Sequence, residues 1–344
     1  MKRRPRQVDV ARLAGVSPAT VSLVLNGRIG GNVRISEETR QRVLDAIQAL
    51  GYVVNPVARS LAGGENRLLG VFTYEAIFPI QNQDFYYPFL IGIEEEAAAL
   101  GYDLLLFTGR GEKDGRRTIF HDGVNRLAMA DGAVLLGLEK DKHELIRLVQ
   151  EGYPFVFVGR REVADVDLAY VAADYVEATA TVLADIFDHG HRRVAYLGMP
   201  VDNESANDRL SGYHLAHERR QYVVDARFVH RLKIDAITPA FVQQHLDLGV
   251  SAFVAEHDSA VEALISAGDA LGKRIPHDFS LAMLGDPLSG RKELAEITAF
   301  TIPRRQMGVH AVRLLLDILT GKSETKHVTL PCRFVAGSSV GRRD

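Results

Sequence analysis

From about residue 66 onward, short continuous apolar runs alternate with stretches of helical period. Each run has four to six residues, a length that suits a buried strand better than a buried helix. The runs are 68–73, 103–107, 133–136, 155–158, 194–198, 252–255 and 281–284, and a helical stretch at 88–100 follows the first of them. This alternation is typical of parallel sheets covered by helices on both faces, and the runs suffice for two sheets. An α/β fold is therefore predicted for this part of the chain.

The first 62 residues differ in charge from the rest of the 344-residue chain. They hold ten Lys and Arg against four Asp and Glu, a net charge of +6, whereas the remainder holds 31 basic and 40 acidic residues, a net charge of −9. A basic module before an acidic one points to a polyanion as partner of the first part only. Charge alone also allows a basic tail that binds nothing, so the pattern inside the module must decide.

Three short helices are predicted within this basic module. The first covers 8–14, with Val10, Leu13 and Ala14 on one apolar stripe, and the second runs from 18 to about 26. Between them stand a glycine break and Ser17, whose side-chain oxygen can cap the second helix. The third begins near Ser36 and ends at 51. Two helices joined by a tight glycine turn form a helix-turn-helix unit.

The second helix has two distinct faces. Its apolar stripe is formed by Val21, Val24 and Leu25. The opposite face, by helical spacing, carries Ala19, Ser22, Leu23 and Asn26. This face is small and mostly polar, as a helix lying in a DNA groove requires.

Four segments of the module closely resemble the DNA-binding head of the lac-repressor (LacI/GalR) family. They are 9–22 (DVARLAGVSPATVS), 24–26 (VLN), 36–40 (SEETR) and 50–52 (LGY). The resemblance extends over about sixty residues, with turn, caps and spacing in order. The DNA-contacting residues that it implies are Arg6, Ser17, Ala19, Thr20, Ser22, Leu23, Asn26 and Tyr52, followed by Asn55, Arg59 and Leu61 in the next segment. Ala19 and Leu23 are expected to face base edges, and the polar and basic residues to contact phosphates.

The segment 55–61 (NPVARSL), followed by Gly63 and Gly64, resembles the hinge helix of the same family. Seven residues are too few for a stable isolated helix in water. By resemblance, the helix forms on DNA and Leu61 enters the minor groove, where it kinks the duplex. A flexible glycine-ended linker with an unrelated leucine is the alternative.

The head departs from the family pattern at two places. Leu23 stands where the family usually has arginine, and leucine can make only apolar contacts such as one with a thymine methyl group. The operator half-site is therefore expected to differ from the usual family site. The loop at 28–34 is also longer than usual; its two arginines either contact phosphates or are merely solvated.

The resemblance continues into the acidic part, through 92–94 (GIE), 101–102 (GY), 131–133 (DGA), 190–194 (GHRRV) and 209–213 (RLSGY). It implies a periplasmic-binding-protein-like core of two subdomains, with three crossings near 170–173, 300–303 and 329–332. A small-molecule effector is expected in the cleft between them, at the carboxyl ends of the strands. The ligand-binding residues implied are Phe85, Tyr86, Arg209, His257, Asp258 and Asp286. Sugar-type ligands need aromatic faces and fixed polar groups of this kind.

The effector residues also depart from the family pattern. His257 precedes Asp258 where the family usually has asparagine, and it is either a ligand donor or a polar residue at a strand end. Gly285 replaces an aspartate that often contacts ligand, and Gly337 stands in place of a usual arginine. The chain has no tryptophan to stack on a sugar ring. The effector therefore stays unidentified, with a sugar as the favoured class.

Other signals are weak. No apolar run approaches the roughly 18 residues that span a bilayer, and no signal-peptide stretch follows the basic N-terminus. The lone Cys332 suits a reducing cytoplasm and excludes a cysteine-rich zinc site within one chain. No catalytic, cofactor or metal constellation stands out. A cytoplasmic, non-enzymatic protein without cofactor, metal or membrane association is predicted.

The sequence thus predicts a transcriptional regulator, namely a repressor, that binds double-stranded operator DNA as a homodimer. The predicted parts are a head at 1–54, a hinge and linker at 55–66, and a core at 67–344, whose N-subdomain takes about 67–170 and 302–329 and whose C-subdomain takes about 171–301 and 330–344. A solute-binding protein without a DNA role is the alternative. A sugar-modifying enzyme of doubly wound fold would need a catalytic cluster that the sequence lacks.

Overall fold

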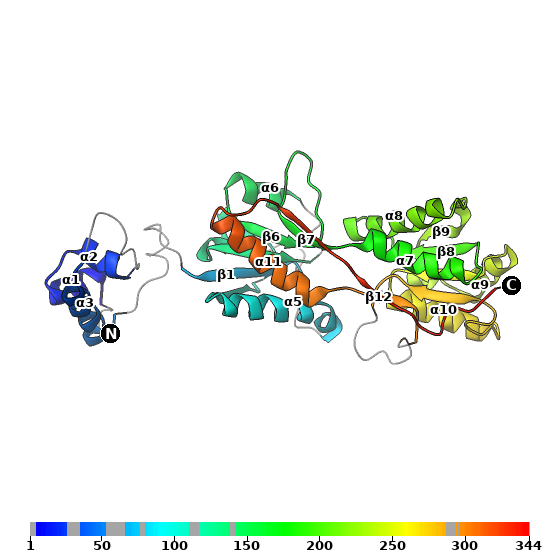
Figure 1. The fold of residues 1–344 in the computed structure, drawn as a ribbon, viewed down its shortest axis with the longest axis horizontal. Coiled ribbons are helices and arrows are strands. Elements are labelled where there is room, and N and C mark those ends of the chain that lie inside the picture. The colour runs from blue at the N-terminus through cyan, green and yellow to red at the C-terminus, as the bar shows by residue number, and fades with distance from the viewer. Residues whose placement is uncertain are drawn as a thin grey trace. The chain divides into compact units, whose positions relative to one another are not determined.

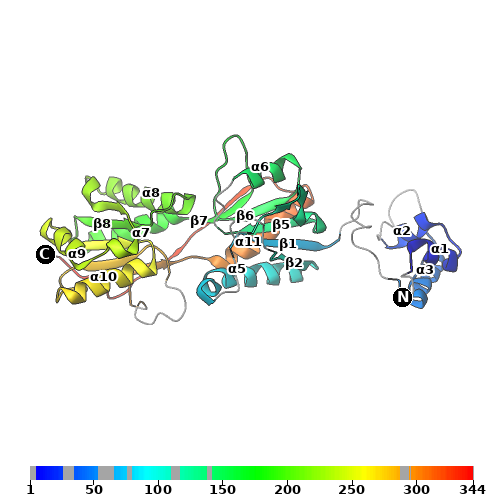
Figure 2. The same ribbon diagram turned by 180° about the vertical axis from the view of Figure 1, so that it is seen from behind.

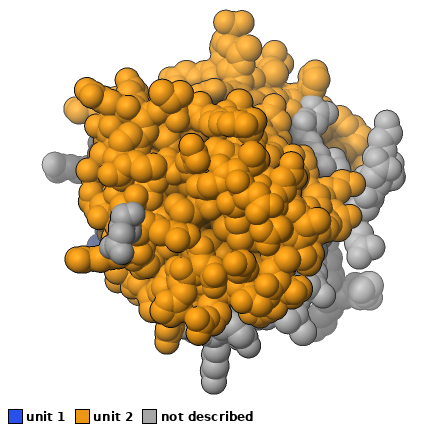
Figure 3. Space-filling view, turned by 90° about the vertical axis from the view of Figure 1, so that its right-hand side faces the viewer, with its two compact units in different colours: residues 1–68, 129–131 blue, residues 69–128, 132–344 orange. Residues whose placement is uncertain are grey.

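The structure is a computed structural model that describes residues 5–25, 35–52, 66–75, 80–109, 117–137, 142–286, 294 and 296–343 (Figure 1). The chain divides into two compact units, a head unit (1–68 with 129–131) and a core unit (69–128 with 132–344). Figure 3 colours them separately, and nearly all described atoms on the face it shows belong to the core unit. Asp131 joins the head unit because its carboxylate accepts hydrogen bonds from the backbone N–H groups of Asn66 and Leu68.

The head unit contains the three predicted helices, α1 (Gln7–Ala14), α2 (Pro18–Leu25) and α3 (Glu37–Leu50). Helices α1 and α2 meet at 103°, within the range for a helix-turn-helix pair. Gly15 supplies the left-handed conformation, at φ +66°, that ends α1. The side-chain oxygens of Ser17 and Ser36 accept hydrogen bonds from the N–H groups of Thr20 and Thr39, at 3.1 and 3.2 Å. The predicted N-cap at Ser17 is therefore confirmed, and Ser36 caps α3 in the same way.

The small core of the head is formed by one buried stripe from each helix. Val10, Val21 and Val43 are fully buried there, with alanines packed around them. The prediction that Leu13 belongs to this stripe was wrong, because Leu13 is 55% exposed and Ala11 is buried in its place. An eight-residue helix in a three-helix unit buries a narrow stripe, and the small Ala11 fits the close approach to α3 better than a leucine.

The core unit begins with a six-stranded sheet in the order β13-β7-β6-β5-β1-β2. Its strands are β1 (Leu68–Thr73), β2 (Asp103–Phe107), β5 (Gly132–Leu136), β6 (Phe155–Val158), β7 (Tyr170–Ala173) and β13 (His327–Leu330). Helices α5 (Ile80–Ala99), α6 (His143–Gln150) and α11 (Arg304–Leu319) accompany it. We call this sheet with its helices the first lobe.

A four-stranded sheet in the order β11-β10-β8-β9 forms the second lobe. Its strands are β8 (Val194–Gly198), β9 (Val229–Arg231), β10 (Ala252–Ala255) and β11 (Ser280–Met283). Its α-helices are α7 (Tyr175–Asp188), α8 (Glu204–Arg219), α9 (Pro239–Asp247) and α10 (Asp258–Ala270). The strand pairs β8–β9, β8–β10 and β10–β11 are parallel, as are β1–β5, β5–β6, β6–β7 and β7–β13 in the first lobe. The predicted α/β class with parallel sheets is confirmed.

The remaining elements are short. They are the hairpin β3 (Phe120–His121) and β4 (Val124–Asn125), the antiparallel pair β12 (Ala299–Thr301) and β14 (Arg333–Val335), and the 3-10 turns η1 (Arg126–Met129), η2 (Ala226–Phe228) and η3 (Ile234–Ala236).

Helix α5 begins eight residues before the predicted start at Pro88, which lies inside it. Proline usually opens a helix because it lacks the N–H, so the sequence favoured a start there. Packing outweighs this preference, because Tyr86, which precedes the proline, is buried in the main hydrophobic cluster. Helix α5 lies beside α11 in both ribbon views (Figures 1 and 2). A Cβ atom on Gly92 would lie 1.9 Å from the carbonyl oxygen of Arg305, so only glycine allows this close approach.

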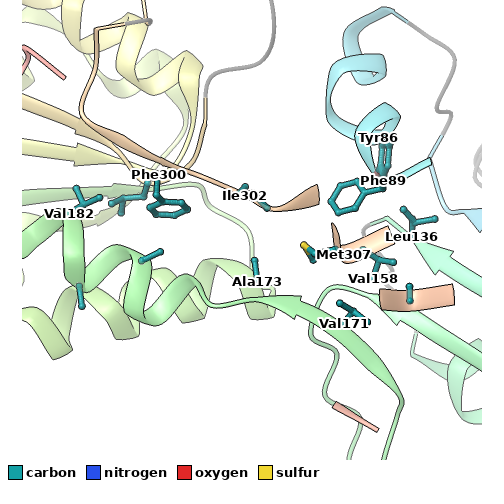
Figure 4. Packing of buried hydrophobic residues seen from close by; sticks show 14 of the residues in the cluster. Tyr86, Phe89, Leu136, Val158, Val171, Ala173, Val182, Phe300, Ile302 and Met307 are labelled. Carbon is teal, nitrogen blue, oxygen red and sulfur yellow. The ribbon is translucent and has the colours of Figure 1, made fainter. Parts of the chain in front are cut away.

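The chain passes between the lobes at three places: between β7 and α7, between β12 and α11, and between β13 and β14. The expected boundary near residue 170 falls inside the first lobe, because the whole of β7 pairs with β13. One hydrophobic cluster continues across the crossings. In Figure 4, Ala173 and Ile302 lie between Val182 and Phe300 on one side and Met307 on the other.

Candidate DNA-binding and effector-binding sites

The face of α2 opposite its buried stripe carries the residues expected to contact DNA. Ala19 is exposed and Ser22 and Leu23 are half-buried, whereas Val21 and Val24 are buried. A hydrogen bond from the Gln7 side chain to the Pro18 carbonyl oxygen, at 3.1 Å, ties α1 to the start of this helix. The small, partly polar face therefore belongs to a helix that is fixed by α1 and by the buried core of the head.

The other expected DNA contacts divide into two groups. Arg6 is exposed just before α1, and Ser17 and Thr20 share a hydroxyl–hydroxyl hydrogen bond of 2.9 Å at the start of α2. Tyr52 is half-buried against the core of the head. The rest lie outside the described residues, namely Asn26, the 28–34 loop, Asn55, Arg59 and Leu61. Their contacts with DNA stay predictions.

Arg209 is the most firmly held of the expected effector residues. It lies on α8, is buried, and donates from Nε to the carbonyl oxygen of Leu284 at 2.6 Å and from Nη1 to that of Ser205 at 2.9 Å. Its guanidinium carbon lies 3.9 Å from the ring centroid of Tyr175, within cation–π distance. Three fixed contacts therefore hold this cation in place.

Asp286 follows β11 and forms an ion pair with Arg304, the first residue of α11. Nη1 of Arg304 lies 2.7 and 2.5 Å from the two carboxylate oxygens. The guanidinium carbon of Arg304 also lies 5.0 Å from the ring centroid of Phe85, which is 39% exposed. Two of the expected effector residues therefore meet at Arg304, which the sequence analysis did not select. The sequence feature that could have indicated Arg304 is the Pro-Arg pair at 303–304, directly after an expected crossing between the subdomains.

Tyr86 differs from its neighbour Phe85. Its ring is buried in the main hydrophobic cluster, and its hydroxyl donates to a carboxylate oxygen of Glu75 at 2.6 Å. Burial, together with the negative charge of Glu75, raises the pKa of Tyr86, so the phenol stays protonated and can donate. Of these two neighbours, Phe85 therefore presents the exposed aromatic ring, and Tyr86 serves to hold Glu75.

His257 and Asp258 follow β10, at the start of α10. Asp258 is buried, and one of its carboxylate oxygens accepts from the N–H of Ser259 at 2.8 Å. The pKa of His257 lies below its ordinary value because the ring is partly desolvated and Arg209 is nearby. A neutral imidazole can both donate and accept a hydrogen bond, which suits a hydroxyl-bearing ligand.

A second polar cluster, which the sequence analysis missed, joins the lobes. Glu204, the first residue of α8, is buried and accepts hydrogen bonds from the N–H of Glu162 at 3.0 Å, from Lys142 at 3.2 Å and from Arg161 at 3.4 Å. Burial alone would raise the pKa of Glu204, but these bonds and charges lower it below its ordinary value. We call this group of four residues the Glu204 cluster.

Next to the Glu204 cluster, Arg160 contacts Asp208 on α8 through Nε at 3.2 Å and Nη2 at 2.5 Å. Arg160 and Arg161 directly follow β6, and Arg161 also donates to the carbonyl oxygen of Gly137, which follows β5, at 2.7 Å. The adjacent arginines at a strand end were the available signal. The carboxyl edges of both sheets therefore meet through charged side chains, where ligands bind in open α/β folds.

Within the described residues, no group of three or more His, Cys, Asp or Glu side chains could hold a metal ion. No single helix in the described ranges is long and apolar enough to cross a membrane. Cys332 lies close to the effector residues, and burial raises its pKa to about 12, so the thiol is neutral at pH 7.

Known proteins resemble this chain along both of its parts. Residues 8–55 match the family described as "Bacterial regulatory proteins, lacI family", and residues 184–340 match the "Periplasmic binding protein-like domain". The HTH-type transcriptional regulator CelR of Thermobifida fusca is 28% identical over 348 residues, which cover 97% of this chain and 96% of that protein. The Maltose regulon regulatory protein MalI of Escherichia coli is 27% identical over 345 residues, covering 95% and 96%.

Solved structures agree along the whole length. A transcriptional regulator CelR–cellobiose complex superimposes with a TM-score of 0.66 at 27% identity and covers 98% of this chain and 100% of its own. The lac repressor dimer bound to operator and an anti-inducer has the same fold, with a TM-score of 0.68 at 22% identity and the same coverage. With a matching head, a matching core and relatives that span both, this chain belongs to the lacI family of DNA-binding transcriptional regulators.

Proposed function

We propose that this regulator is a repressor whose hold on its operator is controlled by a sugar-type effector bound between the two lobes. The observation that carries the proposal is the meeting of Phe85, Arg304 and Asp286, beside a firmly held Arg209, where the carboxyl edges of both sheets converge. The CelR structure is a complex with cellobiose, which supports a saccharide as the class of effector. The protein is not an enzyme in this proposal.

The effector residues match the chemistry of a saccharide. A sugar ring has an apolar face of C–H groups, for which the exposed ring of Phe85 is a suitable platform. Its hydroxyls need donors and acceptors at fixed positions. Arg209 offers a held cation, Asp258 and Asp286 offer carboxylates, and His257 can donate or accept. Because Asp286 already binds Arg304, an effector hydroxyl has to share or replace that ion pair.

On the DNA side, a homodimer places two copies of α2 in successive major grooves of a two-fold symmetric operator. The dimer bound to operator in the lac repressor structure supports this arrangement. Ala19 and Leu23 face base edges in this proposal. The phosphate contacts come from Arg6, Ser17, Thr20, Ser22, Asn26, Tyr52, Asn55 and Arg59. Leu61 enters the minor groove at the operator centre.

Control requires only that the effector binds the two states of the core with different affinity. Glu204 and Asp208 on the second lobe bind cations of the first, and Asp286 binds Arg304, so a ligand that enters among these groups changes the contacts between the lobes. We propose that this change reaches the hinge segments and either releases or secures the operator.

The experiment is a titration of operator binding with a panel of mono- and disaccharides. The operator is first selected from random duplex DNA, and its affinity is then measured by fluorescence anisotropy with each sugar. We expect at least one sugar to change the affinity for operator and to leave non-specific binding unchanged, because operator binding alone uses the hinge. A protein that binds a sugar but enriches no DNA sequence would instead be a solute-binding protein.

A further inference from the structure

A hollow of 540 Å³ lies on the second lobe where its strands begin, at the opposite edge of the sheet from the effector residues. Its charged lining consists of Arg192 and Arg193 just before β8, Lys273 after α10, Asp278 before β11, and Arg343. Four cationic side chains face one carboxylate, a net side-chain charge of +3. We call this site the basic hollow.

Two glycines leave room for arginine atoms at this edge of the sheet, because a side chain at either position would collide with them. Arg193 donates from Nη1 to the carbonyl oxygen of Leu248 at 3.3 Å, and a Cβ atom on Gly249 would lie 2.4 Å from the same Nη1. The N–H of Arg343 donates to the carbonyl oxygen of His189 at 2.8 Å, and a Cβ on Gly190 would lie 2.2 Å from the carbonyl oxygen of Arg343. Both glycines also have positive φ, so the backbone itself is shaped for these contacts.

The carboxylates of the described residues balance only part of the positive charge in the basic hollow. Asp278 already accepts from the N–H of Arg274 at 2.8 Å and lies 3.4 Å from Lys273. Within the described part of the chain, neither Arg192 nor Arg193 has a carboxylate within 4.0 Å. Each keeps guanidinium N–H groups beyond those bound to backbone carbonyls.

The carboxyl ends of three helices offset part of this positive charge. Helices α7, α9 and α10 end near the beginnings of the strands, and the last carbonyls of a helix carry roughly half a negative charge. Arg192 donates to the carbonyl oxygen of Phe187 at 3.1 Å in this way. Three such ends offset about half of the net side-chain charge of the hollow's described lining, which leaves that lining positive.

We propose that the basic hollow binds a small molecule that carries a phosphate group. Guanidinium groups match phosphate oxygens with paired hydrogen bonds, and an ammonium such as that of Lys273 adds a point charge. The volume falls within the usual range for small-molecule sites, which leaves room for more than a free phosphate ion. A phosphate monoester of a small polar metabolite is therefore the class of ligand that this site takes. The site is separate from the effector residues and does not depend on the proposed sugar response.

The test is methyl NMR of the full-length protein, observed at Leu246 and Val250, two apolar residues that line the basic hollow. The probes are inorganic phosphate and ribose 5-phosphate, with ribose and sodium chloride at matched ionic strength as controls. We expect ribose 5-phosphate to shift both resonances saturably, and neither control to do so. In the double variant Arg193→Gln/Lys273→Gln the affinity should fall at least about tenfold, since two charge-assisted contacts are removed.

The matched control is Arg219→Gln, which changes an exposed arginine of the same lobe that pairs with Glu177 outside the basic hollow. It should leave the affinity for ribose 5-phosphate unchanged. If the double variant folds poorly, the affinity for ribose 5-phosphate is measured in the single variant Lys273→Gln. Shifts that are absent, that sodium chloride reproduces, or that persist at full affinity in the folded variants would overturn the proposal.

Discussion

Arg304 holds Asp286 by ion-pair contacts of 2.7 and 2.5 Å, from the first residue of α11 to the end of β11. Arg304 belongs to the first lobe and Asp286 to the second. The ion pair therefore joins the two lobes at the place where the effector is proposed to bind. Both side chains are largely buried. An effector that competes for Asp286 therefore acts directly on a contact between the lobes.

This ion pair should contribute strongly to the stability of the core. Asp286→Ala leaves a largely buried guanidinium without its carboxylate, and breaking such a pair costs about 3 kcal/mol of unfolding free energy. Asp167→Ala breaks an exposed pair with Lys326 and serves as the control, with an expected cost of at most about 1 kcal/mol. Urea unfolding of both variants measures the difference. Equal losses would show that the Asp286 pair is no stronger than a surface pair.

Arg209→Lys should shift the response of operator binding to higher effector concentrations. Lysine keeps the charge but loses the planar fork that contacts two carbonyl oxygens and stacks on Tyr175. We expect the effector dissociation constant, measured by calorimetry, to rise at least about tenfold, the loss of one charge-assisted hydrogen bond. An unchanged constant would place the effector away from Arg209.

The two serine caps of the head offer a matched pair of variants. Ser17→Ala and Ser36→Ala each remove one N-cap hydrogen bond, so each should cost about 1 kcal/mol of stability. Only Ser17 is proposed to contact DNA, so operator affinity, measured at a temperature where both variants are folded, should fall further for Ser17→Ala. If the two variants lose the same affinity, Ser17 acts as a cap alone.

Leu23→Arg should change which operator is preferred. Leucine can contact a thymine methyl group, whereas arginine binds guanine with two hydrogen bonds worth about 1–3 kcal/mol of discrimination. Selection from random duplex DNA with each protein should therefore show a new guanine at one position in each half-site for the variant. Identical selected sequences would mean that residue 23 does not reach the bases.

The Glu204 cluster predicts a dependence of stability on pH. The pKa of Glu204 is lower in the folded protein than its ordinary value of 4.5, so the carboxylate stabilises the fold at neutral pH. That stabilisation is lost as the pH falls through the folded pKa. Glu204→Gln should therefore be less stable than the parent at pH 7 and approach it below pH 4.5. Unfolding curves across this range measure the effect, and a constant difference at all pH values would exclude the linkage.

Much of the fold could be predicted because its determinants are local. Short apolar runs predicted most strands of the two sheets, though not β7, β9 or β13, and the cap at Ser17 predicted the start of α2. The start of α5 could not be found in this way, since burial of Tyr86 ahead of the proline outweighs the preference of Pro88 for a first turn. Likewise, the exposure of Leu13 depends on where α3 crosses α1, which periodicity does not report.

The candidate effector site was predictable only in part. The residues carried over from the family do gather around Arg209 and Asp286, but their partners Arg304 and Glu204 are distant in sequence and have no motif of their own. Tyr86 shows that sequence position alone does not predict whether a side chain faces the ligand. It is next to Phe85 in sequence, yet its ring is buried and its hydroxyl donates to Glu75. Side-chain direction depends on packing that the sequence pattern does not contain.

The control of operator binding by an effector in the core is tested most directly by measuring how binding of the two is coupled in the full-length protein. The affinity for a selected, two-fold symmetric operator is measured with and without the sugar that binds the core, in the parent and in Phe85→Ala. We expect the sugar to change operator affinity at least about fivefold, the lower end of typical allosteric coupling, and Phe85→Ala to remove the change. Sugar binding that leaves operator affinity unaltered in the parent would contradict it.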